Sequence, residues 1–142
     1  MINTEMARDY LHRAKRCLRE ATLALEENDP PGVIRRSQEA LELATKALLR
    51  LLGIEYPRVH DISDVILEQA HRLPDPIKAK AEQLADLISE LAAIRGPAFY
   101  GYEREGIPPS KAFKMNYAKE IYQQVVHYVR LIEDTIKQHQ TA

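Results

Sequence analysis

The chain has 142 residues, 45% of them hydrophobic and 29% charged, and a formal net charge of −1 at pH 7. This length fits one domain over residues 1–142, and the composition is typical of a soluble globular protein. A net charge so near zero argues against a protein that coats nucleic acid with its whole surface. No apolar run approaches the ~20 residues of a membrane span, and the N-terminus lacks a charged segment followed by an apolar one. We therefore expect a cytoplasmic protein that does not engage membranes.

Apolar residues recur in steps of three and four along five stretches, and this period predicts amphipathic helices. The stretches are residues 4–28, 30–52, 62–72, 81–98 and 117–138. We find no repeat and no alternating segment that predicts a strand. Five helices joined by short connections predict an all-α protein, an antiparallel four- to five-helix up-and-down bundle.

Several local signals mark where these helices begin and end. Asp29 before Pro30 fits a helix N-cap followed by a first-turn proline, because the missing proline N–H is not needed there. Asp75 and Pro76 repeat this pattern, Asp61 is placed to cap the short third helix, and Gly53 is a natural stop for the second.

The fourth helix becomes irregular over residues 94–102, where one arginine, two tyrosines and two glycines crowd together. Pro97 cannot donate a hydrogen bond to the carbonyl of Ala93, and Gly96 costs about 1 kcal/mol in helix propensity. The sequence therefore predicts a kink or an early end near Arg95. Residues 101–116 are rich in turn formers and predict a loop.

Few residues outside this segment point to chemistry. The histidines are scattered, and Glu68 with His71 provides only one of the two paired motifs that a di-iron bundle needs, so we predict no metal site and no cofactor. Cys17 is the lone cysteine.

Two further groups have ordinary structural interpretations, which we favour. Glu39, Glu42 and Lys46 lie on one helical face, and we interpret them as a solvated face with an ion pair. His60 precedes a helix and is interpreted as a loop histidine near the cap.

Arg95 has two interpretations that these residues alone leave open. It can be a cation near a helix C-terminus, where the helix dipole makes it worth ~0.3–1 kcal/mol. It can instead be an anion clamp, since the planar guanidinium suits phosphate. Tyr100 and Tyr102 are close enough in sequence to line the same cavity.

Several motifs follow one another over about residues 6–136: the segment 37–49, Gly53, His60-Asp61-Ile62, the long fourth helix with its arginine, and the tyrosine-bearing last helix. In this order they resemble the HEPN domain family. The resemblance implies an all-helical bundle that usually forms homodimers. It also implies a partner, a minimal nucleotidyltransferase, in a toxin–antitoxin-type pair.

Active members of this family are metal-independent endoribonucleases, and the paired subfamily carries Arg-x4-His-x-Tyr, whose tyrosine the partner can modify with AMP. In this sequence Arg95 matches the arginine and Tyr102 the tyrosine, the AMP acceptor, but Tyr100 replaces the histidine. Histidine, with a pKa of about 6.5, exchanges protons at neutral pH, whereas tyrosine, at about 10, is a poor base there. A phenol can still donate a hydrogen bond to phosphate. The resemblance therefore implies binding more directly than catalysis.

Three hypotheses follow. In the first, Arg95, Tyr100 and Tyr102 of a homodimer contact the phosphate of a nucleotide or RNA, and catalysis is weak or absent. In the second, the protein is an active metal-independent ribonuclease toxin in which Tyr100 or His60 replaces the missing histidine. In the third, the bundle is a structural adaptor without a ligand.

Overall fold

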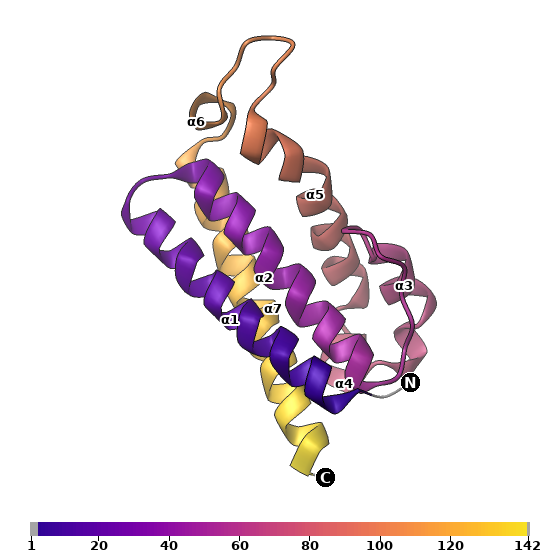
Figure 1. Ribbon diagram of the computed structural model, residues 1–142. Coiled ribbons are helices and arrows are strands. Elements are labelled where there is room, and N and C mark those ends of the chain that lie inside the picture. Colours follow the sequence, from indigo (N-terminus) through magenta and orange to yellow (C-terminus); the bar gives the residue numbers. More distant parts are fainter. Residues whose placement is uncertain (1–2, 142) are drawn as a thin grey trace.

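Four long helices that alternate in direction build the protein, as Figure 1 shows for the computed structural model, which describes residues 3–141. They are α1 (Thr4–Glu26), α2 (Pro30–Leu51), α5 (Ala81–Tyr100) and α7 (Met115–Thr141). Short helices fill the connections: α3 (Ser63–Glu68), the 3₁₀ helix η1 (Ala70–Arg72), α4 (Asp75–Lys78) and α6 (Pro109–Ala112). The prediction of an all-α up-and-down bundle is confirmed.

Helix α2 is the centre of the bundle, because it packs against α1, α5 and α7. Its apolar residues belong to one hydrophobic cluster that also includes buried residues of the other long helices. Leu41 and Leu48 of α2, Leu84 of α5 and Ile132 of α7 are each no more than 1% exposed. Burying one such side chain stabilises the fold by roughly 1.5–3 kcal/mol. The orientation of α2 is therefore set by three neighbours at once.

The two predicted signals around α2 are confirmed. The carboxylate of Asp29 accepts a hydrogen bond from the backbone N–H of Gly32 at 3.2 Å, and Pro30 is the first helical residue. At the other end Gly53 adopts φ 70°, and the amide of Ile54 donates to the carbonyl of Leu49 at 2.9 Å. Such a left-handed residue satisfies carbonyls that the last turn would leave unpaired.

The other two predicted aspartate caps are wrong. Asp61 accepts a hydrogen bond from the amide of Ser63 at 3.0 Å, but Ile62 occupies the cap position of α3. The predicted third helix is also split into α3 and η1. Asp75 is the first residue of α4, and no side chain caps that helix. Both helices are short, so a shift of one residue moves the aspartate out of capping geometry.

Helix α5 continues through Gly96 and Pro97 to Tyr100, so the predicted early end near Arg95 is wrong. One missing N–H in the last turn removes one bond, while buried Ala98 still holds the helix against the core. The helix ends at Gly101, whose φ of 74° and ψ of −161° suit glycine alone and whose amide donates to Pro97 O at 2.7 Å. A bend at Pro97 stays a prediction.

A tight turn follows α5 and projects from the end of the bundle (Figure 1). The backbones of Tyr102 and Ile107 exchange two hydrogen bonds, of 2.8 and 3.0 Å. This isolated bridge is the nearest approach to β structure within residues 3–141. The same residues include no helix long and apolar enough to cross a membrane.

Candidate functional site

Arg95 lies near the end of α5 and is anchored to α2 through a buried glutamine. Its Nε donates to Oε1 of Gln38 at 3.1 Å, and Gln38 is only 3% exposed. The guanidinium is half-buried, and its two terminal nitrogens make no hydrogen bond or ion pair with the side chains that the structure describes. Arg95 is thus held at one edge of its planar group while the other edge is free for a ligand.

The hydrogen bond to Gln38 is the first step of a chain that runs along α2. Nε2 of Gln38 donates to Oε1 of Glu42 at 2.7 Å. The same oxygen is 2.9 Å from Nδ1 of His60, and Oε2 of Glu42 accepts from Nζ of Lys46 at 2.9 Å. Burial works to raise the pKa of Glu42, but the hydrogen bonds from Lys46, Gln38 and His60 and the charge of Lys46 together outweigh it, and the pKa is lowered. Glu42 is therefore ionised at neutral pH.

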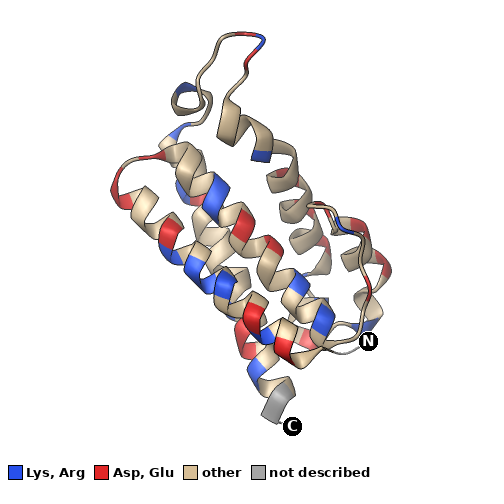
Figure 2. Ribbon diagram, in the orientation of Figure 1, with Lys and Arg blue, Asp and Glu red and all other residues tan. Residues whose placement is uncertain are grey.

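A cavity of about 260 Å³ adjoins this series of hydrogen bonds. It is lined by Arg95, His60 and charged residues of α1 and α2. These further residues are Arg13, Arg35, Arg36, Glu39 and Glu42. Four arginines face two glutamates, so the cavity carries +2 when His60 is neutral. Figure 2 shows bands of Lys and Arg along α1 and α2 and near the end of α5. The cavity is suited to an anion.

Tyr100 shares a second hollow with Arg95, of about 200 Å³, beside Arg35 and Phe99. The guanidinium of Arg35 lies 4.1 Å above the centre of the Phe99 ring. Phe99 and Tyr100 are 47% and 62% exposed, and their rings meet edge to face at 4.5 Å. Exposed rings beside a guanidinium are a surface on which a planar group can stack.

Tyr102 is not brought to Arg95 within one chain. Its ring lies 6.5 Å from that of Phe113, which in turn stacks on Tyr117, and Tyr102 does not line either hollow that contains Arg95. The structure thus joins Arg95 with Tyr100 and places Tyr102, 40% exposed, at the base of the projecting turn. The role of Tyr102 as an AMP acceptor stays a prediction.

Sequence reasoning was partly wrong about the face of α2 that carries Glu42. The ion pair between Glu42 and Lys46 is confirmed, but their side chains are only 17% and 12% exposed, so this face is not solvated. Gln38 was missed, although one signal marks it. It stands four residues after Ile34 and three before Leu41, so a polar side chain interrupts the apolar stripe. Arg13, Arg35 and Arg36 were also missed, and nothing local distinguishes them from other surface arginines.

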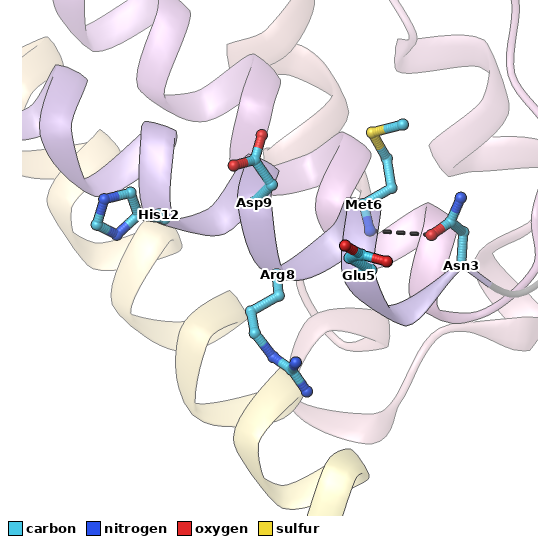
Figure 3. A pocket seen from close by; sticks show the side chains of 6 residues that line it. All are labelled: Asn3, Glu5, Met6, Arg8, Asp9 and His12. Carbon is cyan, nitrogen blue, oxygen red and sulfur yellow. Dashed lines mark hydrogen bonds between the residues drawn. The ribbon is translucent and has the colours of Figure 1, made fainter.

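A larger hollow, of about 630 Å³, lies at the start of α1 but does not form a comparable site. Within residues 3–141, its lining comes from one stretch of chain between Asn3 and His12. Figure 3 shows these side chains pointing in different directions around α1, with Arg8 directed away from Met6 and Asp9. The one hydrogen bond drawn there joins the Asn3 side chain to the amide of Met6, which is a helix cap. Within residues 3–141, no three His, Cys, Asp or Glu side chains gather to hold a metal ion.

Comparisons with known proteins identify the family of this bundle. The HEPN domain model matches residues 7–139, nearly the whole chain. Searches of curated proteins and of solved structures found no match. The match includes α1, α2 and α5, the helices that contribute Arg13, Gln38 and Arg95 to the candidate site. The chain therefore belongs to the HEPN domain family.

Proposed function

We propose that this HEPN protein binds the phosphate of a nucleotide or of RNA through Arg95. The observation that carries the proposal is the guanidinium held by buried Gln38, with its terminal nitrogens uncommitted in a positively charged cavity. Two parallel N–H bonds to phosphate oxygens fit this geometry. Tyr100, exposed in the adjoining hollow, supplies a phenol that can donate to the same phosphate.

The proposal includes the biological setting that the family resemblance implies. The protein acts in the cytoplasm as a homodimer, partnered by a minimal nucleotidyltransferase in a toxin–antitoxin-type pair. The partner modifies Tyr102, whose position at the base of a projecting turn supports access by a second enzyme. Catalysis by the Arg95 motif is weak, because Tyr100 replaces the proton-transferring histidine.

Binding measurements with AMP and with a short single-stranded RNA test the phosphate site. Arg95→Ala should weaken both by about 10- to 100-fold, since a hydrogen bond to a charged group contributes about 1.5–3 kcal/mol. Arg95→Lys should recover only part of the loss, because lysine lacks the planar fork. Arg130→Ala is the matched control, an exposed arginine of α7 that lines a different hollow. If wild type and Arg95→Ala bind AMP and RNA with equal affinity, the proposal is wrong.

The setting has separate tests. Light scattering at micromolar concentration should give twice the monomer mass, and a monomer would contradict the homodimer. The neighbouring reading frame should encode a nucleotidyltransferase, and incubation with that enzyme and ATP should add AMP to wild type but not to Tyr102→Phe. Modification of the Phe variant at the same level would exclude Tyr102 as the acceptor.

A second candidate, metal-independent RNA cleavage through His60, is favoured by one observation. His60 lines the Arg95 cavity and is bonded to Glu42 through Nδ1. An ionised carboxylate only accepts, so Nδ1 carries the hydrogen and Nε2 of the neutral ring is free to accept a proton. Glu42 would then orient the imidazole as the acidic member of a catalytic triad does.

The cleavage needs a proton acceptor and a proton donor, and His60 and Tyr100 can supply them. Nε2 of His60 takes the proton of a ribose 2′-hydroxyl as its oxygen bonds to the adjacent phosphorus. The bond from phosphorus to the 5′-oxygen breaks, and that oxygen takes a proton from the Tyr100 hydroxyl or from water. A 2′,3′-cyclic phosphate results, and Arg95 stabilises the negative charge on the way.

Incubation of RNA with chelator and pure protein tests this candidate. Cleavage should be lost in His60→Ala while RNA binding stays within about threefold of wild type. His12→Ala is the matched control, because His12 lies on α1 in the hollow that lacks a converging site. RNA left intact by the wild-type protein would rule the candidate out and leave the binding proposal standing.

A further inference from the structure

The Arg95 cavity continues past His60 into a third hollow. Glu42 and His60 line both the Arg95 cavity and a neighbouring hollow of about 450 Å³. Arg35 and Arg95 in turn line both the Arg95 cavity and the hollow of Tyr100. Three hollows thus adjoin in series, with exposed rings at one end, Arg95 in the middle and His60 at the second junction.

The third hollow contains a cluster of cations and tyrosines, which we name the distal subsite. It consists of Tyr10, Lys46, Arg50, Tyr56 and Arg58. Nε of Arg50 donates to the hydroxyl of Tyr56 at 2.9 Å, and its guanidinium lies 5.4 and 5.5 Å from the rings of Tyr10 and Tyr56. Nζ of Lys46 lies 5.4 Å from the Tyr56 ring. These contacts fix a platform of rings and cations before any ligand arrives.

Arg58 completes the distal subsite as an uncommitted cation. It is exposed and makes no hydrogen bond or ion pair with the side chains described in residues 3–141. Its guanidinium is therefore available to a ligand, as are the terminal nitrogens of Arg95 in the next hollow. Two separate guanidinium groups, on either side of His60, are available to two phosphates rather than one.

The three hollows concentrate positive charge on a chain that is nearly neutral. Together they are lined by seven lysines and arginines and two glutamates, a net charge of +5 with His60 neutral. The rest of the chain must carry −6, because the whole chain carries −1. This distribution of charge attracts a polyanion to the three adjoining hollows, which we call the track, and repels it from the remaining surface.

We propose that the distal subsite binds the nucleotide next to the one whose phosphate Arg95 holds. The ligand is then a single strand with consecutive phosphodiesters that crosses His60, not a mononucleotide. The inference rests on the proposed function, because the strand is placed by Arg95. Rings at both ends of the track favour a nucleic acid over an acidic peptide, since every base offers a face for stacking.

Affinity as a function of ligand length tests the proposal. Fluorescence anisotropy with a labelled RNA of about eight nucleotides, within the site sizes of single-strand binders, is compared with competition by AMP and by single-stranded DNA of equal length. The oligonucleotide should bind at least about tenfold more tightly than AMP. Arg58→Ala should weaken oligonucleotide binding several-fold and reduce the salt slope by about 1, with AMP binding unchanged. Tyr56→Leu should also weaken the binding of the oligonucleotide but not that of AMP. Arg130→Ala should change neither affinity.

The outcomes separate the two proposals. If Arg95→Ala weakens AMP and RNA equally but AMP and the oligonucleotide bind alike, the distal subsite is overturned and the phosphate site stands. An Arg58→Ala variant with wild-type RNA affinity and salt slope also overturns it. If Arg95→Ala changes nothing, both fall. The DNA arm decides the source of the strand: comparable affinity assigns recognition to phosphates and bases, and weaker DNA binding assigns part of it to the 2′-hydroxyl.

Discussion

The two parts of α5 have opposite surroundings although they belong to one continuous helix. Leu84, Leu87, Ile88 and Leu91 are at most 4% exposed and hold the helix in the core. Past Arg95, Ala98 still packs in the core, but Phe99 and Tyr100 are 47% and 62% exposed. The first part contributes stability, and the second exposes the side chains to which we assign ligand binding. Substitutions in the two parts should therefore separate folding from binding.

The largest effect should come from the packed part. Leu84→Ala removes a fully buried side chain and leaves a cavity, which typically costs 2–5 kcal/mol of unfolding free energy. Urea denaturation measures this loss. RNA affinity, corrected for the folded fraction, should stay at the wild-type value. A large change in affinity of the folded protein would show that the two parts of α5 are coupled.

The next largest effect concerns the end of the helix. Gly101→Ala forces a side chain into a backbone conformation that costs roughly 1–3 kcal/mol, and the new Cβ collides with the carbonyl oxygen of Ile107. Unfolding free energy should fall by at least this amount, and the turn at Tyr102 should shift. Thermal denaturation with Gly106→Ala alongside is informative, because that glycine also has positive φ but open space around it. Equal losses in both variants would mean that the collision is relieved.

A smaller and pH-dependent effect should come from Glu42 of α2, which lines the same cavity as Arg95 of α5. The pKa of Glu42 is lowered from 4.5 by its partners, so Glu42 stabilises the fold above that pH and the contribution disappears as the pH falls through the folded pKa. Glu42→Gln should cost about 1–2 kcal/mol at neutral pH and progressively less below pH 4.5. Urea denaturation of both proteins over this pH range gives the difference. A loss that does not change with pH would assign the effect to shape rather than charge.

The smallest effect should be a gain. Gly96 lies inside α5 and a Cβ built there meets no atom within 4 Å beyond its chain neighbours and the adjacent backbone of the helix, so Gly96→Ala should stabilise the protein by about 0.5–1 kcal/mol through helix propensity. Ala93→Gly, at an exposed position one turn earlier, should lose a similar amount. Because Gly96 also lines the hollow of Tyr100, the variant shows whether that hollow tolerates a methyl group. A destabilised Gly96→Ala would mean that the helix needs glycine beside Pro97.

Several local features of the fold were predictable from the sequence, although the caps at Asp61 and Asp75 were not. The Asp29 cap, the Gly53 stop and the apolar stripes depend on residues within one or two turns of each other. The continuation of α5 past Pro97 was not predictable from propensity, because packing of Ala98 against the core decides it. Tertiary burial routinely overrides a local preference of about 1 kcal/mol.

The candidate site could be predicted only in part. Arg95 and Tyr100 were recognised from a local motif, but Gln38 is 57 residues away and His60 joins through a loop. Such partners depend on how α2 and α5 cross, which periodicity does not define. The same limit hid Arg58, whose proposed role depends on its making no hydrogen bond or ion pair with the side chains described in residues 3–141.

The central position of α2 has a consequence for the cost of binding. Gln38, Glu42 and Lys46 stand on a helix that three neighbours immobilise, and each side chain is already tied by hydrogen bonds. An incoming anion therefore needs to order little more than the tips of the exposed arginines. Freezing a long side chain costs about 0.5–1.5 kcal/mol, and here the core has removed most of that freedom beforehand. The rotamers that position Arg95 are in this sense selected by the hydrophobic packing of the helix that carries Gln38.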